Sequence, residues 1–235
     1  MQLAERKAKL ILTARREERL KTLSDEVLSF GAEVVVVPGD VTDPEHRAAL
    51  LETAQREFGG LDILINNAGI GGIGTFASAT ESRLRKIMEV NFFAPLELIR
   101  SALPLLGESD DGVIVNVGSV LGHCAVPKKS EYCASKFAMH GISDALRVEL
   151  VEQNIDLLMI SPSTTRSEFF TNAMRSSGKA ATNKKAMTPT QVARATIRAM
   201  QVRRRETILS IGGKTLVAAD RLFPGIMSRI LQRFG

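Results

Sequence analysis

The sequence predicts an α/β fold, a doubly wound parallel sheet in a single domain spanning residues 1–235. Short apolar runs alternate along the chain with longer amphipathic stretches, which is the order of strands and helices in such folds. The apolar runs are continuous, as in residues 33–38 with four consecutive valines, and this is typical of parallel strands buried on both faces. Small and polar residues follow several of these runs, at the points where a parallel sheet binds its ligands.

In the first part of the chain, three predicted strands enclose two helices. In order, these elements are strand 9–13, helix 17–30, strand 33–38, helix 44–58 and strand 62–66. Gly31 ends the first helix, since glycine is frequent just after a helix C-terminus. Asp43 begins the second helix, since aspartate is a good N-cap.

The remaining elements continue the same alternation. They are helix 81–106, strand 112–117, helix 130–150, strand 156–161, helix 189–203 and strand 207–211. An interruption of the long first helix is expected near Pro95. Thr188 and Gln191 stand three residues apart around Pro189, which predicts a capping box with proline at the first helical position.

Composition, charge and residue spacing argue against a membrane-spanning protein, a nucleic-acid-binding protein and a metal site. The chain has 44% hydrophobic and 24% charged residues and a net charge of +5, and no apolar run approaches the ~18 residues of a membrane span. Its sequence has no nucleic-acid-binding signature, so we expect no nucleic-acid partner. Cys124 and Cys133 form no redox pair, and two free thiols favour a reducing, cytoplasmic location. We treat His46, His123 and His140 as structural or surface residues, because they lack metal-ligand spacing, and we expect no metal site.

Ser119, Tyr132 and Lys136 are the candidate catalytic residues. Tyr132 and Lys136 stand four residues apart on a predicted helix, so both side chains project from one face. An ammonium group beside a phenol favours the phenolate, and we expect Lys136 to lower the pKa of Tyr132. A tyrosine tuned in this way can exchange a proton with a substrate oxygen, while Ser119, at a strand end, can hold that oxygen by a hydrogen bond.

Polar clusters at five strand ends indicate a ligand site along one edge of the sheet. The clusters lie at 14–16, 40–42, 66–69, 118–119 and 161–165. Because the carboxyl ends of parallel strands share one edge, we expect these clusters to face a common ligand.

The chain resembles the short-chain dehydrogenase/reductase family through nearly its whole length. The residues that carry the resemblance are NNAG at 66–69, Asn91, Ser119 and YCASK at 132–136. The resemblance implies a Rossmann fold and hydride transfer between a nicotinamide and a carbonyl or secondary alcohol. It also implies that Ser119 orients the substrate oxygen, Tyr132 is the acid/base, Lys136 binds the nicotinamide ribose, and Asn91 holds a water in a proton relay.

The cofactor expected is NADP(H). Enzymes that use NAD place an acid at the end of the second strand, where this chain has Ala14 followed by Arg15 and Arg16. Guanidinium groups pair with a 2′-phosphate, which an acid would repel. From the resemblance we assign further cofactor contacts to Asp40, Val41, Asn67, Ala68, Gly69, Pro162, Thr164 and Thr165.

The sequence departs from the family pattern at its start. The glycine-rich turn and the strand before it are absent, and the chain opens at what resembles the end of the family's first helix. We expect Met1 to be an internal methionine, with a genuine truncation as the alternative. A substrate loop is expected at 168–185, where Phe169 and Phe170 suggest a lid over an apolar substrate.

Assembly and membrane contact leave alternatives open. The helices at 81–106 and 130–150 have more apolar surface than one sheet face covers, and the resemblance implies a homodimer or tetramer. The basic C-terminal tail, at about 214–235, mixes apolar and basic residues, which favours either peripheral membrane contact or burial against a partner subunit. A non-catalytic binding or scaffold protein remains the alternative to an enzyme.

Overall fold

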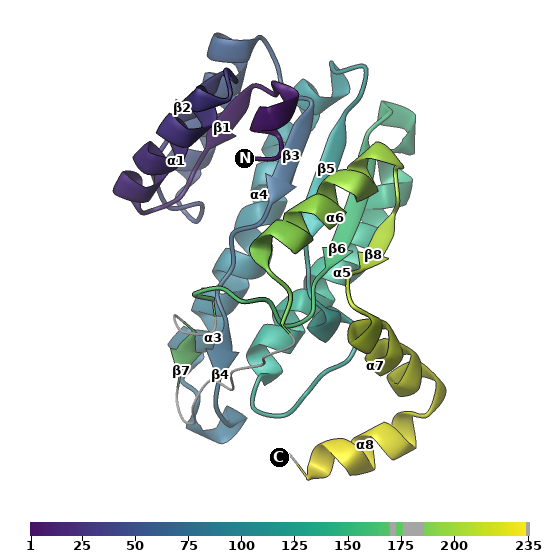
Figure 1. Ribbon diagram of the computed structural model, residues 1–235. Helices are drawn as coiled ribbons and strands as arrows, with labels where there is room; N and C mark the ends of the chain where they lie inside the picture. Colours follow the sequence, from purple (N-terminus) through teal and green to yellow (C-terminus); the bar gives the residue numbers. More distant parts are fainter. Residues whose placement is uncertain (170–172, 176–185, 234–235) are drawn as a thin grey trace.

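The protein is built around a four-stranded parallel sheet with helices on both faces (Figure 1). A computed structural model describes residues 1–169, 173–175 and 186–233. The strands follow the order β3-β5-β6-β8, with bounds Ile63–Asn66, Val113–Val117, Asp156–Ser161 and Glu206–Ile208. All three strand pairs are parallel, which confirms the predicted fold class.

Each face of this sheet has its own apolar core, because successive strand residues point to opposite sides. On one face, Ile114 and Leu157 pack with α4 (Ala94–Gly107) and the end of α5 (Ser130–Glu149). On the other face, Val115 and Leu158 pack against α6 (Pro189–Gln201). Burial on both faces explains why the strands read as continuous apolar runs.

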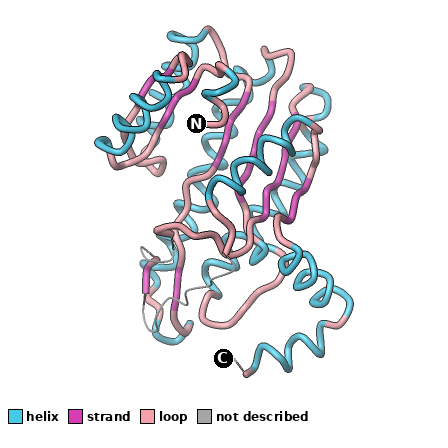
Figure 2. Tube along the Cα trace, in the orientation of Figure 1, coloured by secondary structure: helices cyan, strands magenta, loops and turns pink. Residues whose placement is uncertain are grey.

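The N-terminal strands form a separate pair beside the main sheet (Figure 2). β1 (Leu10–Leu12) pairs in parallel with β2 (Val34–Val36), and α1 (Glu17–Ser29) connects them. Among the described residues no strand lies between β1 and β3, and Ile63 and Ile65 of β3 remain 39% and 38% exposed. The predicted sheet is therefore divided between β1 and β3, where the sequence lacks the family's first strand.

The interruption predicted near Pro95 is a change of helix type and not a break. α3 (Glu81–Met88) passes through a π-helical segment, Glu89–Phe93, directly into α4. Pro95 lies just after the π segment, at the second position of α4, so the change of helix type lies at the point where the proline removes a backbone N–H. The π segment holds the buried Asn91, and such segments are frequent at functional sites.

Two helix starts predicted from the sequence are confirmed by their caps. The carboxylate of Asp43 accepts a hydrogen bond from the backbone N–H of Glu45 at 3.0 Å, at the start of α2 (Pro44–Thr53). Thr188 and Gln191 form the expected capping box at the start of α6.

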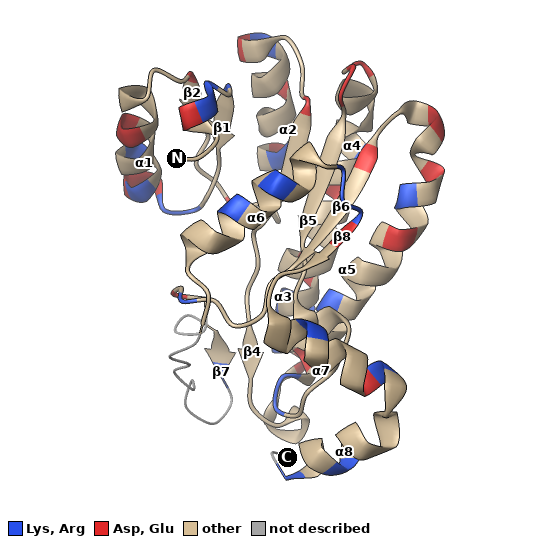
Figure 3. Ribbon diagram, turned by 45° about the vertical axis from the view of Figure 1, so that its right-hand side comes forward, with Lys and Arg blue, Asp and Glu red and all other residues tan. Residues whose placement is uncertain are grey.

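The last predicted strand ends earlier than expected. Ser210 accepts a hydrogen bond from the N–H of Gly213 at 2.8 Å, and this cap begins α7 (Ile211–Leu222) directly after β8. α8 (Pro224–Gln232) follows, and both helices contain basic residues, coloured blue in Figure 3. No helix in the described part of the chain is both long and apolar enough to cross a bilayer.

Short elements complete the described chain: η1 (Ala4–Arg6), η2 (Ala54–Phe58), β4 (Gly72–Ile73), η3 (Phe76–Ser78), η5 (Val120–Gly122), η6 (Val151–Gln153) and β7 (Met174–Arg175). Of these, β4 pairs in parallel with β7 beside the main body.

Candidate functional site

The three candidate catalytic residues meet at the carboxyl end of β5. Ser119 follows this strand, and its Oγ accepts a hydrogen bond from the N–H of Leu121 at 3.1 Å, which caps η5. Tyr132 and Lys136 come from the first two turns of α5, and all three side chains are buried. Gly122 lets η5 approach this helix, since a Cβ there would lie 2.7 Å from the carbonyl oxygen of Lys136.

The expected lowering of the Tyr132 pKa is wrong for this structure. Burial raises the pKa of Tyr132 to about 12, and a hydrogen bond with Ser119 only partly opposes the rise. The ring of Phe169 packs edge-on against the Tyr132 ring, with centroids 5.5 Å apart, and contributes to this burial. The desolvation of the phenol therefore outweighs the hydrogen bond with Ser119.

The ammonium group of Lys136 lies at the carboxyl end of β5. Its Nζ donates a hydrogen bond to the carbonyl oxygen of Val117 at 2.9 Å and lies 5.9 Å from the centroid of the Tyr132 ring. Burial lowers the pKa of Lys136 to about 8. The ammonium group is therefore near its titration point at neutral to mildly alkaline pH.

Asn91 holds the loop that follows β3. Its Nδ2 donates to the carbonyl oxygen of Ile70 and to Ser135 Oγ, both at 2.9 Å, and its Oδ1 accepts from the N–H of Ile70 at 2.8 Å. Gly69 lies against it, since a Cβ there would be 3.3 Å from Asn91 Oδ1 and 3.8 Å from Lys136 Nζ. Asn91 thus joins the NNAG turn to the catalytic helix, and its expected role in a water relay stays a prediction.

The arginines expected to bind a 2′-phosphate lie at the exposed start of α1. Arg15 is 3.8 Å from the carboxylate of Asp40, and Arg16 is 2.7 Å from that of Glu168. Arg19 also pairs with Glu168, and hydrogen bonds from Arg19 and Arg16 hold the pKa of Glu168 at about 2. Two acids therefore lie beside these arginines, although they come from the loops after β2 and β6 and not from the end of β1.

Asp40 and Val41 are held by Thr42 in their own loop and by two arginines from other elements, Arg15 and Arg47. Burial would raise the pKa of Asp40, but hydrogen bonds from Thr42 and the charge of Arg15 hold that pKa below its usual value. The carbonyl oxygen of Val41 accepts a hydrogen bond from Arg47 at 2.8 Å. The Asp40 carboxylate stays ionised at the entrance of the site.

A single cavity of about 2020 Å³ connects these groups. Every predicted site residue except Asn91 lines it: Arg15, Arg16, Asp40, Val41, Asn67, Ala68, Gly69, Ser119, Tyr132, Lys136, Pro162, Thr164 and Thr165. The cavity exceeds the roughly 300–1,000 Å³ of ordinary ligand pockets because it also includes the space between β1 and β3. The predicted clusters at the strand ends therefore face one common space.

Two groups at or near the site were missed by the sequence analysis. Glu168 and Phe169 were seen only as the start of a substrate loop, of which 170–172 and 176–185 lie outside the described residues. His123 and His140 converge on Glu206, with atoms able to bind a metal all within 4.8 Å of one another. Spacing could not reveal this cluster, because Glu206 comes from β8, far along the chain.

Comparisons with known proteins agree with this architecture. A family model described as short chain dehydrogenase matches residues 1–178. A mouse dehydrogenase/reductase SDR family member 7B is 37% identical over 175 residues, covering 73% of this chain and 54% of its own length. The ketoacyl reductase HetN of Nostoc is 30% identical over 239 residues, covering 99% of this chain and 83% of its own.

Solved structures give the same result. A short-chain dehydrogenase from Sphingobium yanoikuyae in complex with NADPH superposes with a TM-score of 0.80 at 30% identity, covering 97% of this chain and 88% of that one. A family member from Burkholderia phymatum in complex with NAD has a TM-score of 0.83 at 23% identity, covering 93% and 85% of the two chains, and shows the shared fold. The chain spans only about half of the mouse relative's length and 66% of that of the oxidoreductase YxnA of Bacillus subtilis. With three quarters of its length matched by the family model, the chain belongs to the short-chain dehydrogenase family of oxidoreductases.

Proposed function

We propose that the chain is an NADP(H)-dependent oxidoreductase that interconverts a carbonyl and a secondary alcohol, with Tyr132 as the general acid/base. The observation that carries the proposal is that Ser119, Tyr132 and Lys136 line one cavity, which Arg15 and Arg16 also line. The relative from Sphingobium was solved with NADPH, which supports the choice of cofactor.

The residues present fit the two ends of a nicotinamide dinucleotide, although the described residues include no glycine-rich turn for its pyrophosphate. Gly69 leaves an open cradle beside Lys136 and Asn91, since a Cβ there would lie 3.3 Å from Asn91 Oδ1. Arg15 and Arg16 supply positive charge for a 2′-phosphate, and the neighbouring Asp40–Thr42 turn provides a polar wall. We assign the nicotinamide end to Lys136, Pro162, Thr164 and Thr165, which line the inner part of the cavity.

The side chains supply the proton chemistry. A bound NADPH would supply the hydride that reduces the substrate carbon. With a pKa of about 12, Tyr132 keeps its proton at neutral pH and can donate it to a carbonyl oxygen that gains negative charge. The hydroxyl of Ser119 lies beside that of Tyr132 and can hydrogen-bond the same oxygen. Lys136 would stabilise the phenolate left behind.

An apolar substrate is favoured by the surroundings of Tyr132. Val120, Leu121 and Cys133 pack around its ring, with Val126 and Phe169 against the same cluster. Burial of an apolar ketone or aldehyde against such side chains is favourable at about 25 cal/mol per Å².

Titration with NADPH and NADH, followed by a panel of apolar ketones and aldehydes, tests this function. We expect saturable fluorescence of bound NADPH, tighter binding of NADPH than of NADH, and consumption of NADPH with at least one carbonyl. Binding without any turnover would favour the non-catalytic alternative, and no saturable binding of either cofactor would contradict the proposal.

We also propose a homodimer or tetramer formed through α4 and α5. Phe93, Phe137 and Val148 are 49%, 42% and 75% exposed on this helical layer, where a second copy could cover them. The α7–α8 helix pair is a second apolar surface, with Leu222, Ile226 and exposed arginines, and peripheral membrane contact there is a separate proposal.

A further inference from the structure

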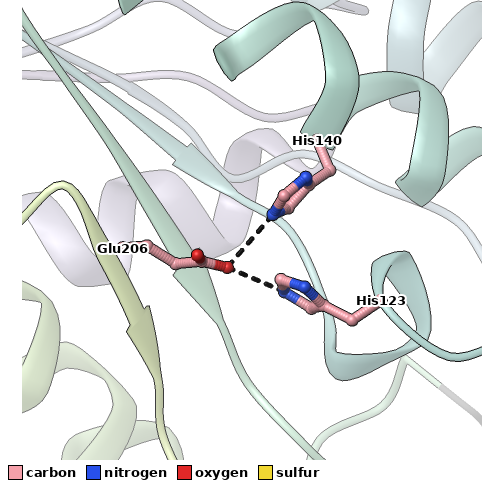
Figure 4. Close-up of side chains that lie close together, drawn as sticks. All are labelled: His123, His140 and Glu206. Atoms are coloured by element: carbon pink, nitrogen blue, oxygen red, sulfur yellow. Dashed lines mark hydrogen bonds and ion pairs between the residues drawn. The ribbon is translucent and has the colours of Figure 1, made fainter. Parts of the chain in front are cut away.

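His123, His140 and Glu206 form a cluster that takes no part in the proposed chemistry (Figure 4). His123 ends η5, His140 lies one turn beyond Lys136 on α5, and Glu206 begins β8. Three elements that meet only in the folded protein thus each contribute one side chain. His123 is buried, and the other two are partly buried.

The atoms of this cluster converge on one carboxylate oxygen. Glu206 Oε1 lies 3.1 Å from His123 Nε2 and 3.0 Å from His140 Nε2. The two imidazole rings are edge to face, with centroids 4.3 Å apart. Both nitrogens therefore point at the same carboxylate oxygen, as the dashed lines in Figure 4 show.

These distances match the spacing of ligands around zinc. Zinc binds imidazole nitrogen and carboxylate oxygen at about 2.0–2.1 Å in a tetrahedron, whose edges are then about 3.3 Å long. The two separations from Glu206 Oε1, 3.0 and 3.1 Å, need to open by only a few tenths of an ångström to admit the ion, and all the ligand atoms lie within 4.8 Å of one another. Two histidines and one carboxylate are also a ligand set that zinc prefers.

The surroundings provide a fourth position and an outer carboxylate. Ser161 Oγ lies 2.9 Å from His123 Nε2, at the edge of the cluster, where it or a water can complete the tetrahedron. On the far side of His140, an Asp144 carboxylate oxygen lies 3.5 Å from Nδ1. An acidic group behind a ligating histidine fixes its tautomer and strengthens zinc binding.

We propose that His123, His140 and Glu206 form a zinc site that joins η5, α5 and β8. The site is separate from the cavity that holds Tyr132 and Lys136, and a bound ion would fix the Ser119 loop against α5. The proposal stands independently of the oxidoreductase activity, because zinc binding is measured without cofactor or substrate.

Zinc titration of the tag-free 235-residue chain, against a competing chromophoric chelator, tests the site. We expect one equivalent to bind, and Co²⁺ in its place to give the visible absorption of a four-coordinate ion. At zinc 100-fold above Kd, the melting temperature should rise by about 5–10 °C, because the ion binds the folded state alone.

Two variants and one matched control make the test specific. Glu206→Gln keeps an oxygen that accepts hydrogen bonds from both imidazoles but removes the charge, and we expect at least a tenfold loss of zinc affinity. His140→Asn should lose both the affinity and the rise in melting temperature. His46→Asn is the control, since His46 is also buried but bonds to Thr13 in the N-terminal part.

The outcomes separate a zinc site from a purely hydrogen-bonded cluster. No saturable binding by the wild-type chain would overturn the proposal, as would equal binding by the wild type and Glu206→Gln. If His140→Asn fails to fold, the Glu206→Gln comparison decides alone, because that change preserves the shape and the hydrogen bonds of the cluster.

Discussion

Replacing Lys136 by methionine should change how the stability of the protein depends on pH. Burial lowers the pKa of Lys136 from 10.5 to about 8 in the folded protein. Between these two values the unfolded chain binds one more proton than the folded chain, so the free energy of unfolding of the wild type rises with pH in this window. A shift of about 2.5 units corresponds to about 3 kcal/mol at 1.36 kcal/mol per unit.

Lys136→Met has no titrating group at this position, so the difference in unfolding free energy between the variant and the wild type reports the titration of Lys136 alone. At pH 7, Lys136→Met escapes the cost of the buried charge but loses the hydrogen bond to Val117, worth about 1 kcal/mol. We expect it to be about 2 kcal/mol more stable than the wild type at pH 7, and to lose this advantage by about pH 10.

Urea denaturation at intervals from pH 7 to pH 10 measures the difference. Lys214→Met, at an exposed position on α7, is the control and should follow the wild type throughout. Parallel stability curves for Lys136→Met and the wild type would refute the reasoning, because they would mean that the lysine is not desolvated in the folded state.

Three further predictions concern the cofactor, the fold and the assembly. Arg15→Ala and Arg16→Ala should each weaken NADPH binding about tenfold or more, because a charge-assisted hydrogen bond is worth about 1.5–3 kcal/mol. NADH binding, measured by the same fluorescence titration, should change little. Equal losses for both cofactors would count against the assignment of these arginines to the 2′-phosphate. The buried guanidinium of Arg83 lies 3.0 Å from a carboxylate oxygen of Glu131. Glu131→Ala leaves this charge without its partner, so we expect the free energy of unfolding, measured by urea denaturation, to fall by about 3–5 kcal/mol. Replacing Arg83 and Glu131 together by methionine and leucine should cost far less, and equal costs would argue against an ion-pair effect. Light scattering at micromolar concentration should give the mass of a dimer or tetramer, and a monomeric mass would rule out the proposed assembly.

Much of the fold was predictable because its signals are local. Continuous apolar runs follow from strands covered on both faces, and the Thr188 cap and the Asp43 cap act within three residues of the helix start. Ser119, Tyr132 and Lys136 were also identified from sequence spacing, and the parallel sheet brings the strand-end clusters to one cavity, as its topology requires.

The features that sequence reasoning missed depend on distant parts of the chain. The pKa of Tyr132 is set by how deeply it is buried, including by Phe169 from a loop that follows β6. Glu168 reaches Arg16 across 152 positions, and Glu206 reaches His140 across 66. No local pattern encodes such contacts, because they arise only once the sheet has brought the elements together.

Replacing Tyr132 by phenylalanine tests the central claim most directly. The change removes only the hydroxyl group, and a single-turnover reaction with NADPH and a reducible carbonyl then separates proton transfer from binding. We predict that the rate falls at least about 100-fold, the smallest usual contribution of general acid catalysis, while the Kd for NADPH changes by less than about twofold. A variant that retains more than about a tenth of the wild-type rate would contradict the role of Tyr132 as the proton donor.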